Sequence, residues 1–292
     1  MTGVSDWTGG VGDAWAREWR RTDRSFAGLS PQLNAAILAA DRADAPGMVD
    51  IGCGAGGTSL ALAAALGSGS ITGIDLSPSL IAIARSRAGD QLREGSGEAG
   101  RATVKFLCAD VIEGVADCTP VDLYCSRHGV MFFADPVAAF SALRAAAAPG
   151  AALVFSCFAD RAANRWAIEP VIGGETPAPP STAPGPFAFA DPTHVAAILA
   201  QAGWSAEPPR RVDFAYRAGG GPDAVADAVD YLGRIGPAAS VLRAAAPDDR
   251  DRAIAHLTHA CAARFNGEGV EFPASAWIWT SYNRPELQGS QP

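Results

Sequence analysis

Short apolar runs alternate with alanine-rich amphipathic stretches through the middle of the chain. The runs have the length of buried strands, and the stretches between them have the length and composition of helices. The expected strands lie at 47–51, 70–75, 103–108, 121–125 and 151–157, and the expected helices at about 57–66, 78–88 and 136–147. Repeated strand–helix units of this kind predict a parallel sheet with helices on both faces.

The two ends of the chain depart from this alternation. Residues 1–45 have helical periodicity, with Trp15 and Trp19 four positions apart on one face and a second helix beginning near Ser30. A proline-rich run within 159–190 excludes helix and central strand, and 89–101 is typical of an exposed loop. The remaining expected elements are a helix at about 191–202, a strand at 211–216, two or three amphipathic helices over 222–265 and a last strand at 274–282.

The composition indicates a folded protein that needs no disulfide bonds for its stability. Its 292 residues are 48% hydrophobic and 18% charged, enough apolar material for one large core. The six cysteines form no CxxC pair, and no stretch has the 18 apolar residues that a membrane span requires. The N-terminus carries charges and tryptophans where a signal peptide would be apolar, so we expect a cytoplasmic protein.

Net charge narrows the choice of partner. The chain has 23 basic and 31 acidic residues, a net charge of −8, and no basic stripe. Such a surface repels a phosphate backbone, so we expect a small-molecule substrate and no nucleic acid. Monomer and homodimer both remain open.

A glycine-rich turn follows the first expected strand. Gly52, Gly54 and Gly57 satisfy the dinucleotide-binding pattern GxGxxG, which is weak evidence by itself. Asp50 lies at the end of the strand, where its carboxylate would repel a pyrophosphate. The same carboxylate would attract the ammonium and sulfonium of S-adenosylmethionine, so charge favours that ligand over NAD.

Two further strands also end in an acid. Asp75 is placed to accept both ribose hydroxyls, a role that NAD and S-adenosylmethionine sites share. Asp110 is placed to accept from an adenine amino group, with Leu76, Ala109 and Val111 as apolar neighbours of the ring. Each acid alone could be a helix cap, but three at one sheet edge indicate a ligand crevice.

VDIGCGAGGTSL, ITGIDLS and CADV, in this order and spacing, resemble motifs I, II and III of class I S-adenosylmethionine-dependent methyltransferases. Later segments, among them SRHGVMFFADP and PGPFAFADPTHVAAILAQAGW, are similar to a bacterial group related to ubiquinone and menaquinone biosynthesis methyltransferases. The resemblance implies a Rossmann-like sheet of seven strands whose last strand, at about 274–280, runs antiparallel. It also implies S-adenosyl-L-methionine as cofactor and S-adenosyl-L-homocysteine as product.

The patterning along the chain gives a domain layout: an N-terminal helical lid (1–45), a cofactor-binding core (46–158), cap insertions with late sheet elements (159–265) and a last strand with tail (266–292), all in one structural domain. The resemblance adds further cofactor contacts. It places Cys53 in the glycine turn and Ser126 at the end of the fourth strand near the methionine end of the cofactor. Trp15 and Trp19 would cover the sulfonium from the lid, although packing of the lid onto the core explains them equally well.

Methyl transfer from a sulfonium needs a base only when the acceptor loses a proton. His128 follows the fourth strand and is the leading candidate, against the alternative of a packed histidine without chemistry. Candidate substrate contacts are Phe132, Arg161, Arg165, Trp166, Phe187 and His194. We expect no metal, because the spacing of His256, His259 and Cys261 on one helix is more typical of surface residues.

Two other functions stay open. A nicotinamide-dependent oxidoreductase is disfavoured by Asp50 and by the absence of a Tyr-x-x-x-Lys pair. A non-catalytic module that binds S-adenosylmethionine would keep the same motifs. The sequence does not distinguish O-, N- and C-methylation.

Overall fold

A computed structural model describes residues 7–40, 44, 46–94, 102–174 and 182–284. Its centre is a parallel sheet formed by β1 (Gly47–Ile51), β2 (Ser70–Asp75), β3 (Thr103–Cys108), β4 (Val121–Arg127) and β5 (Ala147–Phe158). The order of these five strands is β3-β2-β1-β4-β5, so the chain reverses its direction of travel across the sheet between β1 and β4. Ligands of open α/β sheets bind at the carboxyl ends of the strands at such a point.

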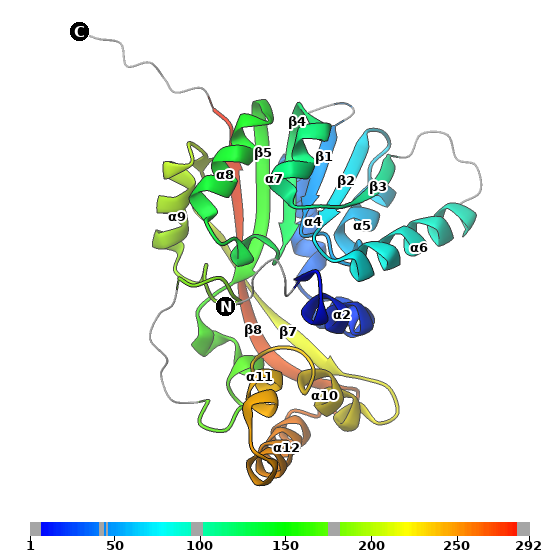
Figure 1. The fold of residues 1–292 in the computed structure, drawn as a ribbon, viewed down its shortest axis with the longest axis vertical. Coiled ribbons are helices and arrows are strands. Elements are labelled where there is room, and N and C mark those ends of the chain that lie inside the picture. The colour runs from blue at the N-terminus through cyan, green and yellow to red at the C-terminus, as the bar shows by residue number, and fades with distance from the viewer. Residues whose placement is uncertain (1–6, 41–43, 45, 95–101, 175–181, 285–292) are drawn as a thin grey trace.

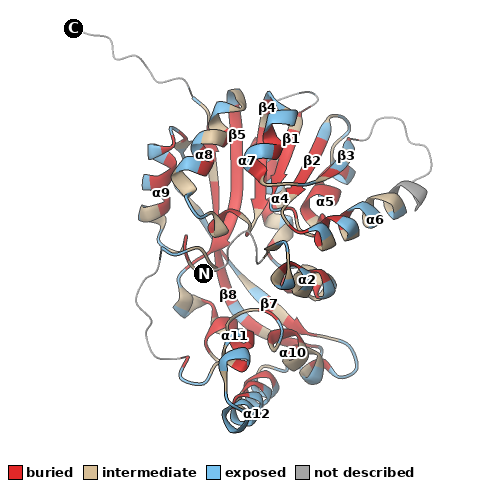
Figure 2. Ribbon diagram, in the orientation of Figure 1, coloured by how far each residue is buried: buried red, intermediate tan, exposed pale blue. Residues whose placement is uncertain are grey.

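Helices cover both faces of this sheet (Figure 1). The helices are α4 (Ser30–Ala40), α5 (Gly57–Ala65), α6 (Pro78–Glu94), α7 (Val111–Gly114), α8 (Pro136–Ala145) and α9 (Pro192–Gln201). The buried residues gather in the central strands and on the inner sides of these helices, as Figure 2 shows. The expected helix at 78–88 was too short, because α6 continues through Gly89 and Asp90 to Glu94, so the expected loop at 89–101 begins as helix. Residues 91–94 favour helix, whereas Gly89 and Asp90 do not.

The predicted antiparallel last strand is confirmed, and within the described residues the sheet has eight strands, one more than expected. β8 (Val270–Tyr282) begins before the expected residue 274 and pairs antiparallel with β5, β6 and β7. β6 (Ser205–Ala206) and β7 (Arg210–Gly219) together take the place of one sixth strand. They are separated at Pro208 and Pro209, which have no N–H to donate to β8.

Beyond the parallel strands, β7 and the first half of β8 continue as a two-stranded ribbon (Figure 1). Three helices pack near this ribbon, as the sequence allowed: α10 (Ala224–Leu232), α11 (Pro237–Ala244) and α12 (Pro247–Ala263). We call the ribbon and these helices the cap. Most of the predicted proline-rich run, at 176–180, lies outside the described residues.

The N-terminal segment is helical as predicted. α2 (Gly10–Arg17) and α3 (Trp19–Ser25) lie between the sheet and the cap (Figure 1), and we call this pair the lid. Among the helices of the described ranges, none is both long and apolar enough to cross a membrane.

Candidate functional site

A cavity of about 470 Å³ opens at the carboxyl ends of β1, β2 and β4, between the lid and the cap. Residues of the sheet edge, the lid and the cap all line this cavity. The site residues expected from the sequence that line it are Trp15, Trp19, Asp50, Gly52, Cys53, Gly54, Asp75, Leu76, Ala109, Asp110, Val111, His128, Phe132 and Trp166.

The glycine turn after β1 needs glycine for its backbone conformation. Gly52, Gly54 and Gly56 have φ values of +63°, +54° and +78°, which L side chains rarely adopt. A Cβ atom at Gly52 would lie 3.1 Å from Cα of Gly129, whereas one at Gly54 would meet nothing within 4 Å. The turn is therefore packed against the end of β4 on one side and open beside Gly54.

Asp50 is buried at the end of β1, with 1% of its surface exposed. Its Oδ2 accepts a hydrogen bond of 2.6 Å from Oγ of Ser59 on α5. Burial raises the pKa of Asp50 to about 6, against the opposing effects of the Ser59 hydrogen bond and of Arg127. At pH 7 the carboxylate is thus ionised in a setting that stabilises it poorly, and it gains from any cation that reaches the cavity.

Asp75 joins the glycine turn to the end of β2. Its Oδ2 accepts from the backbone N–H of Gly54, and its Oδ1 from that of Ser77, both at 2.8 Å. Burial raises the pKa of Asp75, while these two bonds oppose the rise. Each oxygen keeps further acceptor capacity for a hydroxyl donor.

Asp110 combines the two roles considered for it. It is the N-cap of α7, where its side chain accepts from the backbone N–H of Ile112 at 2.8 Å, and it also lines the cavity. Ala109 and Val111 line the cavity beside it, and Leu76 lines it from the end of β2.

His128 is the residue with the most unusual local structure in the site. It has a φ of +61°, the one positive value among the described non-glycine residues. Its Nδ1 lies 2.9 Å from Oγ of Ser156, and its Nε2 is buried without a hydrogen-bond partner. Desolvation lowers the pKa of His128 to about 3, so the imidazole is neutral at pH 7. This weakens its candidacy as a general base and leaves it a neutral hydrogen-bonding group.

The lid contributes aromatic side chains to the cavity and is fixed by ion pairs on both sides. The indole of Trp19 has the guanidinium groups of Arg20 and Arg87 at 4.4 and 4.2 Å from its ring centroid. Asp23 pairs with Arg87 at 3.0 Å and with Arg127 at 2.7 Å, which fastens α3 to α6 and β4.

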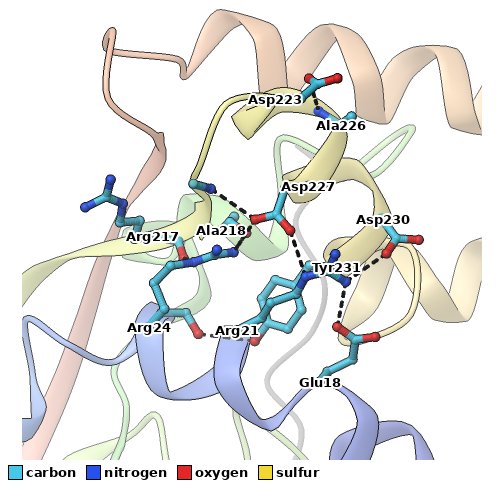
Figure 3. A network of polar contacts seen from close by, with 12 residues as sticks. Glu18, Arg21, Arg24, Arg217, Ala218, Asp223, Ala226, Asp227, Asp230 and Tyr231 are labelled. Carbon is cyan, nitrogen blue, oxygen red and sulfur yellow. Dashed lines mark hydrogen bonds and ion pairs between the residues drawn. The ribbon is translucent and has the colours of Figure 1, made fainter.

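A second set of ion pairs fastens the lid to the cap (Figure 3). Arg21 on α3 contacts Asp227 at 2.8 Å and Asp230 at 2.7 Å, both on α10. It also contacts Glu18, which is buried and pairs again with Arg234 at 2.9 Å. We call these five residues the lid–cap network. The lid is therefore held in place over the cavity by charges on the cap.

Five expected site residues do not line the cavity. Ser126 is buried behind the wall, where its Oγ donates to the carbonyl of Ile51 at 2.7 Å and accepts from Gly129 N–H. It therefore joins the ends of β1 and β4. His194 lies in the first turn of α9, away from the cavity.

The other three of these residues support the wall. Arg165 pairs with Glu169 at 2.8 Å, and Arg161 donates to the carbonyl of Ala167. Phe187 stacks behind Trp166 with the ring centroids 6.1 Å apart. All three contact the segment that carries Trp166 and hold its backbone or ring.

Sequence reasoning missed several lining residues. The lid residues Asp23 and Phe26 and the cap residues Tyr216 and Ile235 line the cavity together with Arg127. Arg127 was detectable, since it directly precedes His128 at the end of a strand. The lid and cap residues reach the site only through the tertiary fold and left no local signal.

No group of three or more metal-binding side chains occurs within the described part of the chain. Nε2 of His256 lies 2.9 Å from the carbonyl oxygen of Glu169, so this ring packs against the loop that carries Trp166.

Comparison with known families matches residues 49–155 to a family described as "Methyltransferase domain". This range runs from β1 through most of β5 and contains all three strand-end aspartates. Comparison with curated proteins gave no match at the sequence level.

Solved structures with the same fold include three of similar extent. A putative methyltransferase from Bacillus halodurans C-125 has a TM-score of 0.54 at 13% identity, over 87% of this chain and 99% of that one. Magnesium protoporphyrin IX methyltransferase from Synechocystis PCC 6803, with bound SAH, has a TM-score of 0.52 at 16% identity, over 94% and 98%. A cyclopropane-fatty-acyl-phospholipid synthase-like protein from Lactobacillus casei ATCC 334 has a TM-score of 0.50 at 18% identity, over 87% and 90%. At these identities the likeness is one of fold.

Proposed function

Residues 49–155 are a class I S-adenosylmethionine-dependent methyltransferase domain, and on this premise we propose that the chain methylates a small molecule bound between this domain, the lid and the cap. The observation that carries the proposal is the single cavity that joins the glycine turn and the three strand-end aspartates to the aromatic residues of lid and cap. Cofactor and acceptor would share this one space.

The cavity wall suits S-adenosylmethionine better than a dinucleotide. The buried carboxylate of Asp50 attracts the cationic methionine end and would repel a pyrophosphate at the same turn. Open space beside Gly54 admits a ligand against the backbone. In this assignment Asp75 binds the ribose hydroxyls, and Asp110 with Leu76, Ala109 and Val111 binds the adenine.

The cofactor, when bound, supplies an activated methyl group on a positively charged sulfur. The chain's own residues then need to orient the acceptor in line with that group and to exclude water. Trp15 and Trp19 line the cavity from the lid, and Trp166 lines it from the turn Arg165–Ala167 that follows β5. The lid–cap network fixes the position of the lid relative to α10.

His128 would orient the acceptor through a hydrogen bond to Nε2. Its neutral imidazole donates or accepts a hydrogen bond at this atom, according to the tautomer that the Ser156 bond selects. A strong base at this position is not required for an acceptor that loses its proton to water after transfer. Whether the acceptor atom is oxygen, nitrogen or carbon is left to the acceptor screen.

Two further expectations accompany the proposal. All six cysteines are free thiols, which supports a reducing compartment such as the cytoplasm. We also propose that the protein is a monomer or a homodimer.

Calorimetry with S-adenosylhomocysteine and with NAD tests the cofactor. We expect saturable binding of S-adenosylhomocysteine and none of NAD, and the reverse result would overturn the proposal. An acceptor screen, read by mass spectrometry for the gain of one methyl group, then separates an enzyme from a non-catalytic module. A module would bind the cofactor without forming S-adenosylhomocysteine from S-adenosylmethionine with any acceptor.

A further inference from the structure

One end of the cavity, on the side of the cap, is built almost entirely from rings. We call this end the aromatic chamber and define it by Phe26, Phe158, Trp166, Tyr216, Ile235 and Gly236. Trp166 stacks on Tyr216 with centroids 4.8 Å apart and planes 14° apart, and Phe158 lies 5.0 Å from Trp166. Gly236 brings the loop after α10 against the Trp166 ring, since a Cβ there would lie 3.1 Å from the indole.

The polar ends of these rings are already used on the far side of the wall. The Tyr216 hydroxyl lies 3.1 Å from that of Tyr231, and Nε1 of Trp166 donates to Oδ1 of Asn164 at 3.2 Å. The rings therefore offer the chamber hydrocarbon faces. Such faces favour flat apolar ligands that can stack or make edge contacts.

His128 supplies a polar atom beside the chamber that has no hydrogen-bond partner among the described residues. Its ring centroid is 4.2 Å from that of Phe158 and 4.7 Å from that of Phe26, and its Nε2 has no partner. An unpartnered buried polar atom costs free energy that a ligand atom can recover. The next residue, Gly129, packs against Gly52, so the backbone at His128 lies beside the glycine turn while its ring contacts the chamber.

Charged side chains near the chamber are already paired or bonded. The guanidinium of Arg127 lies 5.4 Å from the ring centroid of Phe26, but it is paired with Asp23 at 2.7 Å. Asp135 caps α8 by accepting from Ala138 N–H at 2.9 Å. Within the described chain, no residue that defines the chamber carries a charge at neutral pH. A charged acceptor would lose its hydration there without gaining a counterion.

We propose that the methyl acceptor is an uncharged aromatic molecule, held in the aromatic chamber by ring contacts and by one hydroxyl or carbonyl oxygen hydrogen-bonded to Nε2 of His128. This inference rests on the proposed function, because it assumes that the glycine turn is filled by the cofactor. The chamber selects for ring shape and against charge, and His128 sets which edge of the ring faces the turn.

Equilibrium dialysis of three probes against the full chain saturated with S-adenosylhomocysteine tests this assignment. The probes share one ring system: 1-naphthol is neutral and polar, naphthalene lacks the polar atom, and 1-naphthoate is an anion. We expect 1-naphthol to bind about 3- to 10-fold tighter than naphthalene, the effect of one hydrogen bond. We expect 1-naphthoate to bind at least about 100-fold more weakly than 1-naphthol, because its charge is buried unpaired.

Two variants with matched controls locate the probe. His128→Phe should reduce the affinity for 1-naphthol to that for naphthalene, while His259→Phe on the exposed face of α12 should change neither. Trp166→Leu should weaken the binding of 1-naphthol and of naphthalene about 10-fold. Trp277→Leu, at a half-buried indole outside the chamber, should not.

The failure modes are distinct. Equal binding of 1-naphthoate and 1-naphthol, or no binding of either to the loaded protein, overturns the inference and leaves the proposed function standing. Failure of S-adenosylhomocysteine to bind overturns the proposed function and the inference with it. If His128→Phe does not fold, the comparison of the three probes on the wild-type chain still decides.

Discussion

The side-chain amide of Asn164 accepts the indole N–H of Trp166 at 3.2 Å and thereby sets the ring that closes the cavity. Asn164 is fully buried, and its Nδ2 donates to the carbonyls of Ala159, Asp160 and Ser275. The same Oδ1 also accepts from Ser275 N–H. One amide thus fixes Trp166 to β8 and to the end of β5.

Asn164→Ala should lower the free energy of unfolding by about 2–4 kcal/mol, because buried donors and acceptors lose their partners. Urea denaturation measures this change. Asn266→Ala, at an exposed turn amide whose side chain makes three hydrogen bonds, should cost less than half as much. Equal losses for the two variants would contradict the assigned role of Asn164.

Asp50→Asn should affect stability and cofactor binding in opposite directions. Removing a buried charge should raise the free energy of unfolding at pH 7 by about 1–3 kcal/mol. Loss of the carboxylate should weaken the binding of S-adenosylhomocysteine at least about 10-fold. Asp122→Asn, at the opposite end of the sheet, is the control and should leave cofactor affinity unchanged.

The raised pKa of Asp50 also predicts a pH dependence. The pKa is about 6 in the folded chain against an ordinary value of 3.8, so the folded state binds this proton at a higher pH than the unfolded state does. The stability that this proton brings is fully present below pH 3.8 and is lost as the pH rises through 6. Cofactor affinity should fall as the pH drops below about 6, and calorimetry from pH 5 to 8 should find no such fall in Asp50→Asn.

His128 predicts the opposite dependence of stability on pH. Its pKa is lowered from 6.5 to about 3, so its contribution to stability is present above pH 6.5 and is lost as the pH falls toward 3. The ring signals of His128 should not titrate between pH 5 and 8 in NMR spectra, with His128→Asn used for assignment. A titration near pH 6.5 would restore His128 as an ordinary general-base candidate.

The lid–cap network predicts that cofactor release depends on charge. Arg21→Met breaks contacts to α10 and leaves buried Glu18 with fewer partners, so we expect about 1–3 kcal/mol lower stability and faster cofactor release. Stopped-flow displacement of the cofactor measures the rate. Arg252→Met removes a fully exposed pair on α12 and should change neither quantity. Equal release rates in the two variants would show that other contacts hold the lid.

Local sequence pattern was sufficient for the glycine turn and the three strand-end acids. Parallel strands that end in Asp50, Asp75 and Asp110 must bring these residues to one edge, so period and spacing place them without knowledge of packing. The number of strands was harder, because β6 has only two residues, too few to show a strand period, and Pro208 and Pro209 separate it from β7. The acceptor end of the cavity was hardest, since Phe26, Tyr216 and Ile235 meet only after the chain has closed on itself.

β8 has a consequence for how molecules enter the cavity. One uninterrupted strand pairs with β5 through its second half and with β7 through its first, so sheet and cap share a backbone. A swinging movement of the cap would break this shared ladder or bend it sharply, whereas α2 and α3 are joined to their surroundings by side chains alone in the contacts described above. We therefore expect molecules to enter and leave the cavity by movement of α2 and α3, while the cap keeps its position relative to the sheet.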